Sequence, residues 1–180
     1  MTIPNLITTL RIILTPIFII YLLDEQFVVA LVVFVICVVS DGLDGFLARV
    51  LKQKSALGAL LDPIADKLIL VSTFVSLSVM GAVPVWLTVT VLSRDVLISL
   101  GVAALHIYRV EIRIRPSVLS KITTCCQFAT VAAVLVSKFV LMPEALYDWL
   151  FGLTAAATIA SGLHYMQAWF KMMGQEERLP

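Results

Sequence analysis

Long apolar runs, separated by short polar or turn-forming stretches, dominate this sequence of 180 residues. Each run is about 20 residues long, the length that a helix needs to cross the hydrocarbon core of a bilayer. Acidic residues, glycine or proline mark several of the breaks, as at residues 24–26, 81–84 and 142–144. The pattern predicts an all-α, polytopic membrane bundle of six transmembrane helices, which cover residues 6–23, 27–50, 57–80, 85–107, 118–141 and 146–170.

The composition agrees with this class of protein. Hydrophobic residues make up 61% of the chain and charged residues 14%, and the mean hydropathy is +1.03. Soluble domains carry about 25% charged residues. The net charge of +1 argues against a protein that binds nucleic acid. The sequence contains no recognisable soluble domain, linker or internal repeat, so we expect one membrane domain over residues 1–180.

Lysine and arginine concentrate in alternate connections between the predicted spans. They lie between the second and third spans, between the fourth and fifth spans, and in the C-terminal tail, whereas the first and fifth connections carry acids. Because basic connections stay in the cytoplasm, this distribution predicts that both termini are cytoplasmic. The connection between the second and third spans is then cytoplasmic too.

Four aspartates lie close to that connection: Asp41, Asp44, Asp62 and Asp66. A carboxylate at membrane depth costs roughly 2.5 kcal/mol or more, so it indicates a functional site. The spacings of three and four residues place the two acids of each helix on one face. Such a set of carboxylates suits magnesium or manganese, whose remaining coordination positions are usually filled by substrate phosphates.

Small residues share the helix faces of these aspartates. Gly45, Ala48 and Gly58 leave room for a bulky ligand against the backbone. The alternative is a charged collar without a ligand, in which the aspartates pair with nearby basic residues: Arg49, Lys52, Lys54 and Lys67. We prefer a binding site, because a glycine inside a helix costs about 1 kcal/mol and these glycines lie on the stripe of the acids.

With these residues, the sequence resembles a known family. The run DxxDGxxAR from Asp41 to Arg49, followed after eight residues by GxxxDxxxD from Gly58 to Asp66, matches the signature of the CDP-alcohol phosphatidyltransferases at every fixed position. Residues 4–11 are similar to the amino terminus of the phosphatidylglycerophosphate synthases and cardiolipin synthases of that family. The resemblance implies a six-helix membrane bundle that is usually a homodimer.

The resemblance also implies a reaction and a role for each signature residue. Family members transfer a phosphatidyl group from CDP-diacylglycerol to the hydroxyl of an alcohol and release CMP. The four aspartates would hold two magnesium or manganese ions, and Asp66 would also take the proton of the acceptor hydroxyl. The CDP group would be bound by residues of the same two helices: Asp44, Gly45, Ala48, Arg49 and Gly58.

Basic residues of the fourth and fifth spans are candidates for binding the acceptor. Arg115 and Lys121 suit a phosphate group, although anchoring to anionic lipid also explains a basic cluster. Arg94 precedes Asp95 inside the fourth span, where a site-facing role for Arg94 and a structural hydrogen bond for Asp95 are both considered. Because helical neighbours point about 100° apart, we expect these two residues to serve different partners.

Two acceptors compete. The motif Ser117-x-x-x-Lys121-x-x-Thr124-x-x-Gln127 resembles the fifth helix of glycerophosphate-type members, but Thr123 stands where those proteins often have a second lysine. We predict glycerol 3-phosphate as the acceptor, which would make the protein a phosphatidylglycerophosphate synthase. The alternative is phosphatidylglycerol, the acceptor of a cardiolipin synthase.

Two other classes are weaker alternatives. In a cation transporter or channel, the acids would follow a path across several spans, whereas here they cluster at one end of two spans. In a non-catalytic lipid-binding paralogue, we would expect a signature aspartate to be missing. We therefore expect an enzyme of the bacterial inner membrane whose active site faces the cytoplasm.

Overall fold

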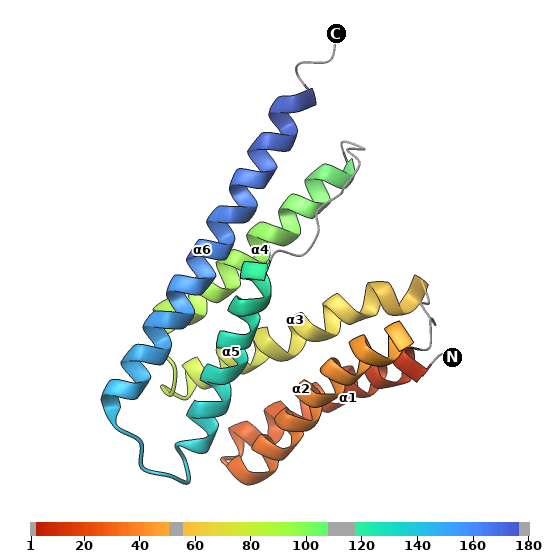
Figure 1. Ribbon diagram of the computed structural model, residues 1–180. Coiled ribbons are helices and arrows are strands. Elements are labelled where there is room, and N and C mark those ends of the chain that lie inside the picture. Colours follow the sequence, from red (N-terminus) through yellow and green to blue (C-terminus); the bar gives the residue numbers. More distant parts are fainter. Residues whose placement is uncertain (1–2, 51–55, 108–117, 177–180) are drawn as a thin grey trace. The chain divides into compact units, whose positions relative to one another are not determined.

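The structure is a computed structural model that describes residues 3–50, 56–107 and 118–176, and the side chains of residues 6–42, 65, 67–101 and 118–169. Within these residues the chain forms six helices and no strand (Figure 1). The predicted all-α class is therefore confirmed. The helices are α1 (Ile3–Leu23), α2 (Phe27–Val50), α3 (Ala56–Val79), α4 (Val85–Ile107), α5 (Val118–Val136) and α6 (Glu144–Glu176).

The ends of α5 and α6 differ most from the spans expected from the hydropathy pattern. Helix α5 ends at Val136, although the apolar run continues to Leu141. Residues 137–140 form hydrogen-bonded turns instead, and Pro143 disfavours a helical conformation in the residue before it. Helix α6 continues beyond its predicted span, through a more polar segment to Glu176.

The chain divides into two compact units. The first unit consists of Met1–Pro84 and Val131–Met142, and it contains α1, α2, α3 and the end of α5. The second unit consists of Val85–Thr130 and Pro143–Pro180, and it contains α4, most of α5 and α6.

In the first unit, α1 packs against both α2 and α3. The rings of Phe18 on α1 and Phe34 on α2 have centroids 5.9 Å apart, and Phe74 of α3 is fully buried. A tight turn at residues 24–26 reverses the chain, with Glu25 at a positive φ of 58°, as is common where a helix ends. Helices α1 and α2 are therefore antiparallel, and the start of α1 lies at the same end of this unit as the end of α2 (Figure 1).

Helix α1 buries polar residues along part of its length and exposes large apolar residues on the opposite face. Thr8, Arg11 and Thr15 are buried, at spacings of three and four residues. Large apolar side chains are exposed along the opposite face: Leu6, Leu10, Ile13, Ile17 and Ile20. A surface helix of a soluble protein has the reverse pattern. The arrangement is the one expected when lipid, in place of water, surrounds the outer face.

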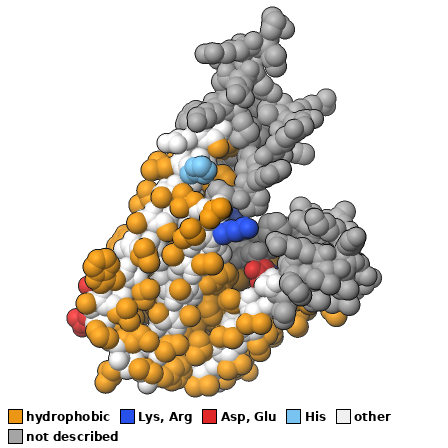
Figure 2. All heavy atoms as spheres, in the orientation of Figure 1, with side chains coloured by type: hydrophobic (Ala, Val, Ile, Leu, Met, Phe, Trp, Pro, Cys, Tyr) orange, Lys and Arg blue, Asp and Glu red, His pale blue; other side chains and the backbone are white. Residues whose placement is uncertain are grey.

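Other observations also fit a membrane protein. Figure 2 shows apolar side chains over most of the described surface in that view. By length and composition, two helical segments within the described residues can cross a membrane, Leu6–Leu23 and Val118–Val136. Phe27–Gly42 and Lys67–Val79 are shorter apolar segments. Two of the six predicted spans thus meet this criterion of length and composition, and the membrane topology with the orientation of the termini stays a prediction.

In the second unit, α4 packs against α6. Gly101 of α4 lies against the indole of Trp169, where a Cβ atom would come within 1.6 Å of a ring carbon. This close approach requires glycine. Side-chain hydrogen bonds join α5 to α6, at Thr123 near Ala157 and further along α5 at Thr130 near Thr154. From the first contact to the second, the residue numbers increase on α5 and decrease on α6, so these two helices are antiparallel.

Candidate functional site

The four signature aspartates lie on two helices of the first unit. Asp41 and Asp44 are in α2, and Asp62 and Asp66 are in α3, so the helical spacing used to predict a shared face applies to both pairs. The end of α2 and the beginning of α3 lie at the same end of this unit (Figure 1). The side chain of Asp41 is described. The other predicted metal- and CDP-binding side chains lie outside the described side chains: Asp44, Gly45, Ala48, Arg49, Gly58, Asp62 and Asp66.

A buried arginine of α1 holds Asp41. Nη1 of Arg11 lies 2.9 Å from Oδ1 of Asp41, and the arginine side chain is 1% exposed whereas the aspartate side chain is 39% exposed. In an antiparallel helix pair, residues at similar distances from the connecting turn come together. The turn at residues 24–26 is roughly midway between Arg11 and Asp41, so the hairpin brings them together.

The pairing of Asp41 differs from the charged collar considered from the sequence. That collar would have paired the aspartates with basic residues close to them in the chain, whereas Asp41 contacts Arg11 of a different helix. Sequence reasoning did not assign Arg11 a role. The sequence did contain a signal for such a role: Arg11 is an arginine within an apolar run and has no acidic neighbour in the chain. A charge at membrane depth needs a partner, so such an arginine is expected to pair with an acid of another helix.

The donor set fits a divalent cation. All four predicted ligands are carboxylates, which are the hard oxygen donors that magnesium and manganese prefer. Arg11 contacts Oδ1 of Asp41, and the carboxylate has a second oxygen. Among the described side chains, no three His, Cys, Asp or Glu residues come together around one point. Because three of the predicted ligands lie outside these side chains, the metal site stays a prediction.

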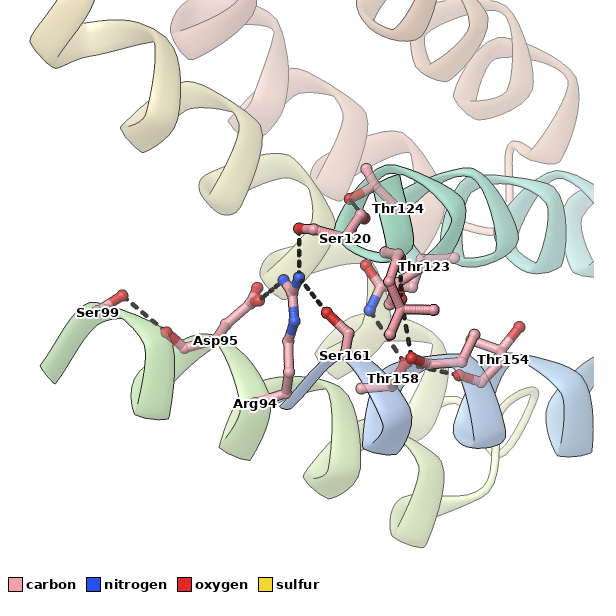
Figure 3. A network of polar contacts seen from close by, with 12 residues as sticks. Arg94, Asp95, Ser99, Ser120, Thr123, Thr124, Thr154, Thr158 and Ser161 are labelled. Carbon is pink, nitrogen blue, oxygen red and sulfur yellow. Dashed lines mark hydrogen bonds and ion pairs between the residues drawn. The ribbon is translucent and has the colours of Figure 1, made fainter. Parts of the chain in front are cut away.

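Arg94 of α4 is at the centre of a polar network in the second unit (Figure 3). Its Nη1 donates to Oδ1 of Asp95 at 2.7 Å, and its Nη2 donates to the hydroxyls of Ser120 at 2.6 Å and Ser161 at 3.0 Å. Ser120 belongs to α5 and Ser161 to α6, so one guanidinium connects three helices. The side chains of Arg94 and Asp95 are 10% and 9% exposed.

The ion pair between Arg94 and Asp95 corrects the expectation that these neighbours serve different partners. Their Cβ atoms point about 100° apart, but the arginine side chain is long enough to bring its guanidinium to the adjacent carboxylate. A buried positive charge is stabilised by such an opposite charge. Since both Nη atoms of Arg94 already bond to protein groups, the contacts favour a structural role, and its acceptor-binding role stays a prediction.

The remaining candidates for acceptor binding lie in or before α5. Arg115 is outside the described residues, whereas Lys121 is exposed and follows Ser120 directly. Thr123 is fully buried, and its hydroxyl donates to the backbone oxygen of Ala157 at 2.9 Å. Positions 121 and 123 are about 200° apart on the helix. The residue that replaces the second lysine therefore faces α6, away from Lys121.

Sequence reasoning also missed the polar contact between α5 and α6. The Oγ1 atoms of Thr130 and Thr154 lie 2.7 Å apart, and Nε2 of Gln127 donates to Oγ1 of Thr158 at 3.4 Å. All four residues are buried. Hydrogen bonds of this kind contribute about 0.6 kcal/mol each between membrane helices. The available signal was the repeat of Thr154, Thr158 and Ser161 at helical spacing within an apolar stretch.

Comparison with known proteins defines the class. The family model for CDP-alcohol phosphatidyltransferase matches residues 1–160, which include the whole signature. This chain belongs to the CDP-alcohol phosphatidyltransferase family, and the resemblance inferred from the signature is confirmed. The family is membrane-associated and generally depends on divalent metal ions.

Individual relatives carry two kinds of name. The chain is 37% identical over 182 residues to the cardiolipin synthase (CMP-forming) of Rattus norvegicus, and the alignment covers 91% of this chain and 60% of that protein. It is 35% identical over 185 residues to the human protein of the same name, covering 91% of this chain and 61% of that protein. It is also 37% identical over 171 residues to the CDP-diacylglycerol–glycerol-3-phosphate 3-phosphatidyltransferase of Pseudomonas fluorescens, covering 91% of this chain and 84% of that protein. The chain spans about three fifths of the length of the rat and human relatives.

Proposed function

We propose that this protein transfers a phosphatidyl group from CDP-diacylglycerol to the hydroxyl of a glycerol-type alcohol and releases CMP. The observation that carries the proposal is the complete aspartate signature on α2 and α3, in a chain of the CDP-alcohol phosphatidyltransferase family. The acceptor oxygen forms a bond to the phosphorus of the phosphatidyl group. The bond from that phosphorus to the bridging diphosphate oxygen breaks, and CMP leaves with this oxygen. Asp66 takes the proton of the acceptor hydroxyl.

The signature residues bind either the metal or the donor, and Asp44 contributes to both sites. Asp41, Asp44, Asp62 and Asp66 would hold two magnesium or manganese ions. When bound, these ions neutralise charge on the leaving group and polarise the phosphorus. Arg49 would lie near a phosphate of the donor, and the small residues would leave space for the cytidine. The CDP-binding set is Asp44, Gly45, Ala48, Arg49 and Gly58.

The proposed enzyme works within a membrane as one domain over residues 1–180. The inverted polarity of α1, with Arg11 inside and Ile13 outside, supports contact with lipid. The positions of lysine and arginine favour six spans with both termini and the active site on the cytoplasmic side of a bacterial inner membrane. The acyl chains of the donor would then stay in the bilayer while its charged head group reaches the aspartates. A homodimer is the expected assembly.

Two acceptors are candidates, and the observations favour phosphatidylglycerol over glycerol 3-phosphate, the acceptor predicted from the sequence. A phosphate monoester such as glycerol 3-phosphate carries a charge of about −1.5 to −2 at pH 7, whereas the diester of phosphatidylglycerol carries a single negative charge. Thr123 packs against α6, so no second lysine accompanies Lys121 at that position. The names of the rat and human relatives point the same way. The Pseudomonas relative supports glycerol 3-phosphate.

The test is CMP release by the full-length protein, purified in detergent, with CDP-diacylglycerol and magnesium. Release that requires phosphatidylglycerol would support a cardiolipin synthase, and release that requires glycerol 3-phosphate would support a phosphatidylglycerophosphate synthase. The variant Asp44→Asn is expected to abolish release with either acceptor. Release with neither acceptor by the unaltered protein would contradict the proposed reaction.

A further inference from the structure

Arg11 is a charged residue buried in a helix whose outer face is apolar. Its side chain is 1% exposed, and the transfer of a guanidinium out of water is unfavourable unless an opposite charge or hydrogen bonds compensate. The carboxylate of Asp41 supplies that charge at 2.9 Å. Asp41 is the first aspartate of the signature. Arg11 therefore contacts the proposed metal site, although it belongs to none of the metal, donor or acceptor groups assigned above.

The contact leaves part of the carboxylate for another partner. Nη1 of Arg11 meets Oδ1, and a carboxylate has two oxygens with about four acceptor positions in total. The side chain of Asp41 is 39% exposed, in contrast to Asp95, whose side chain is 9% exposed in its own ion pair with arginine. An ion pair with only a structural role would be expected to bury both members, as the pair of Arg94 and Asp95 does.

The surroundings of Arg11 keep it in place. Thr8 and Thr15, about one turn before and after it, are buried on the same face of α1, and Oγ1 of Thr15 donates to the backbone oxygen of Arg11 at 2.9 Å. On α2, Cys37 is buried one turn before Asp41. A guanidinium fixed by such packing restricts the rotation of the carboxylate that it contacts.

We propose that Arg11 is a positioning residue that orients Asp41 for a divalent cation, by holding Oδ1 and leaving Oδ2 to bind the metal. This inference rests on the proposed function, because it takes Asp41 as a metal ligand. Protein groups that orient a metal ligand from outside the coordination sphere typically contribute 10–100-fold to metal affinity or activity.

The test measures Mn²⁺ binding by the full-length protein in detergent, without lipid substrate, from the electron paramagnetic resonance signal of free Mn²⁺. Four proteins are compared: the unaltered chain, Arg11→Gln, Asp41→Asn and the double variant. We expect Arg11→Gln to weaken Mn²⁺ binding by about 10–100-fold. Once Asp41 is replaced, the same change should have no further effect, because Arg11 acts through that carboxylate.

Several results would overturn the inference. Equal or tighter Mn²⁺ binding by folded Arg11→Gln would mean that Arg11 only neutralises Asp41 or competes with the metal. Additive losses in the double variant would mean that Arg11 acts independently of Asp41. If the unaltered chain binds no Mn²⁺, this inference and the metal part of the proposed function fail together. If the unaltered chain binds Mn²⁺ and Arg11→Gln binds it with the same affinity, this inference fails while the proposed function stands.

Two further variants keep the test decisive. If Arg11→Gln does not fold, Arg11→Lys, which keeps the charge, is expected to bind Mn²⁺ about tenfold more weakly, and this loss should disappear in the Asp41→Asn background. An unchanged affinity for Arg11→Lys would then overturn the inference. Thr73→Val removes a buried hydroxyl of α3 that donates to the backbone of its own helix, and it should bind Mn²⁺ normally. A loss with Thr73→Val as large as that with Arg11→Gln would indicate general packing damage and also overturn the inference.

Discussion

The two units each contain a buried arginine paired with an aspartate, at 2.9 Å for Arg11 and Asp41 and at 2.7 Å for Arg94 and Asp95. In the first pair the partners come from two helices, and the aspartate is 39% exposed. In the second pair the partners are adjacent on one helix and both are largely buried. The arginine of the second pair also bonds to Ser120 and to a serine of α6.

This difference separates two uses of a buried charge in an apolar environment. The Nη atoms of Arg94 donate hydrogen bonds to side chains of three helices, so these contacts stabilise the second unit. Arg11 meets an aspartate that stays partly accessible, so the same kind of ion pair leaves one carboxylate oxygen for a ligand. The exposure of the aspartate, rather than the length of the ion pair, distinguishes the two roles.

The largest expected effect tests the proposed chemistry of the first unit. Asp66→Asn keeps the size of the side chain but removes the base that accepts the acceptor proton, so transfer should fall by about 10²–10⁴-fold. Binding of CDP-diacylglycerol and the thermal unfolding midpoint should change little. CMP release is the measurement, and a normal rate for this variant would remove Asp66 from the role of base.

The next effect tests the structural role of the second pair. Arg94→Met leaves Asp95 buried without its arginine, which should lower the free energy of unfolding by about 3–5 kcal/mol. Arg94→Met combined with Asp95→Leu should recover much of this loss, since an apolar pair often replaces a buried ion pair without cost. Unfolding in mixed detergent micelles measures both. If Arg94→Met keeps its stability but raises the acceptor KM, Arg94 binds the acceptor, as predicted from the sequence.

A smaller effect is expected at the exposed lysine beside this network. Lys121→Ala should raise the KM for the acceptor about tenfold, which corresponds to about 1.4 kcal/mol, because a cation that meets the acceptor phosphate is lost. The KM for CDP-diacylglycerol should stay nearly constant. Initial rates at varied concentrations of each substrate test this, and equal increases for both substrates would place Lys121 outside the acceptor site.

The smallest effect concerns the hydroxyls that bind Arg94. Ser120→Ala and Ser161→Ala should each destabilise the protein by about 1 kcal/mol, because each removes one hydrogen bond between membrane helices. Ser72→Ala is a matched control, since the Ser72 hydroxyl bonds only to its own helix in the contacts found. Thermal unfolding ranks the three variants. A control as destabilised as the two test variants would indicate that these interhelical bonds contribute little.

Much of the architecture and the signature followed from local patterns. Apolar runs predicted six helices whose bounds mostly agree within a few residues. The exceptions are the end of α5, which precedes Pro143 by several residues, and the end of α6, which continues into a more polar segment. The aspartate spacing placed Asp41 and Asp44 on one helix and Asp62 and Asp66 on the next. Helical periodicity depends on neighbours three and four residues apart, so the sequence contains this information directly.

The partners of the buried charges were decided by the tertiary structure. Arg11 meets Asp41 because the turn at residues 24–26 folds α1 back along α2, and Arg94 meets Ser161 because α4 packs against α6. The sequence by itself determined which segments are helices, which faces carry charge, and to which family the motif belongs. Which charges pair and which aspartate stays accessible depend on how helices distant in the chain pack, and helical periodicity within one segment does not contain that information.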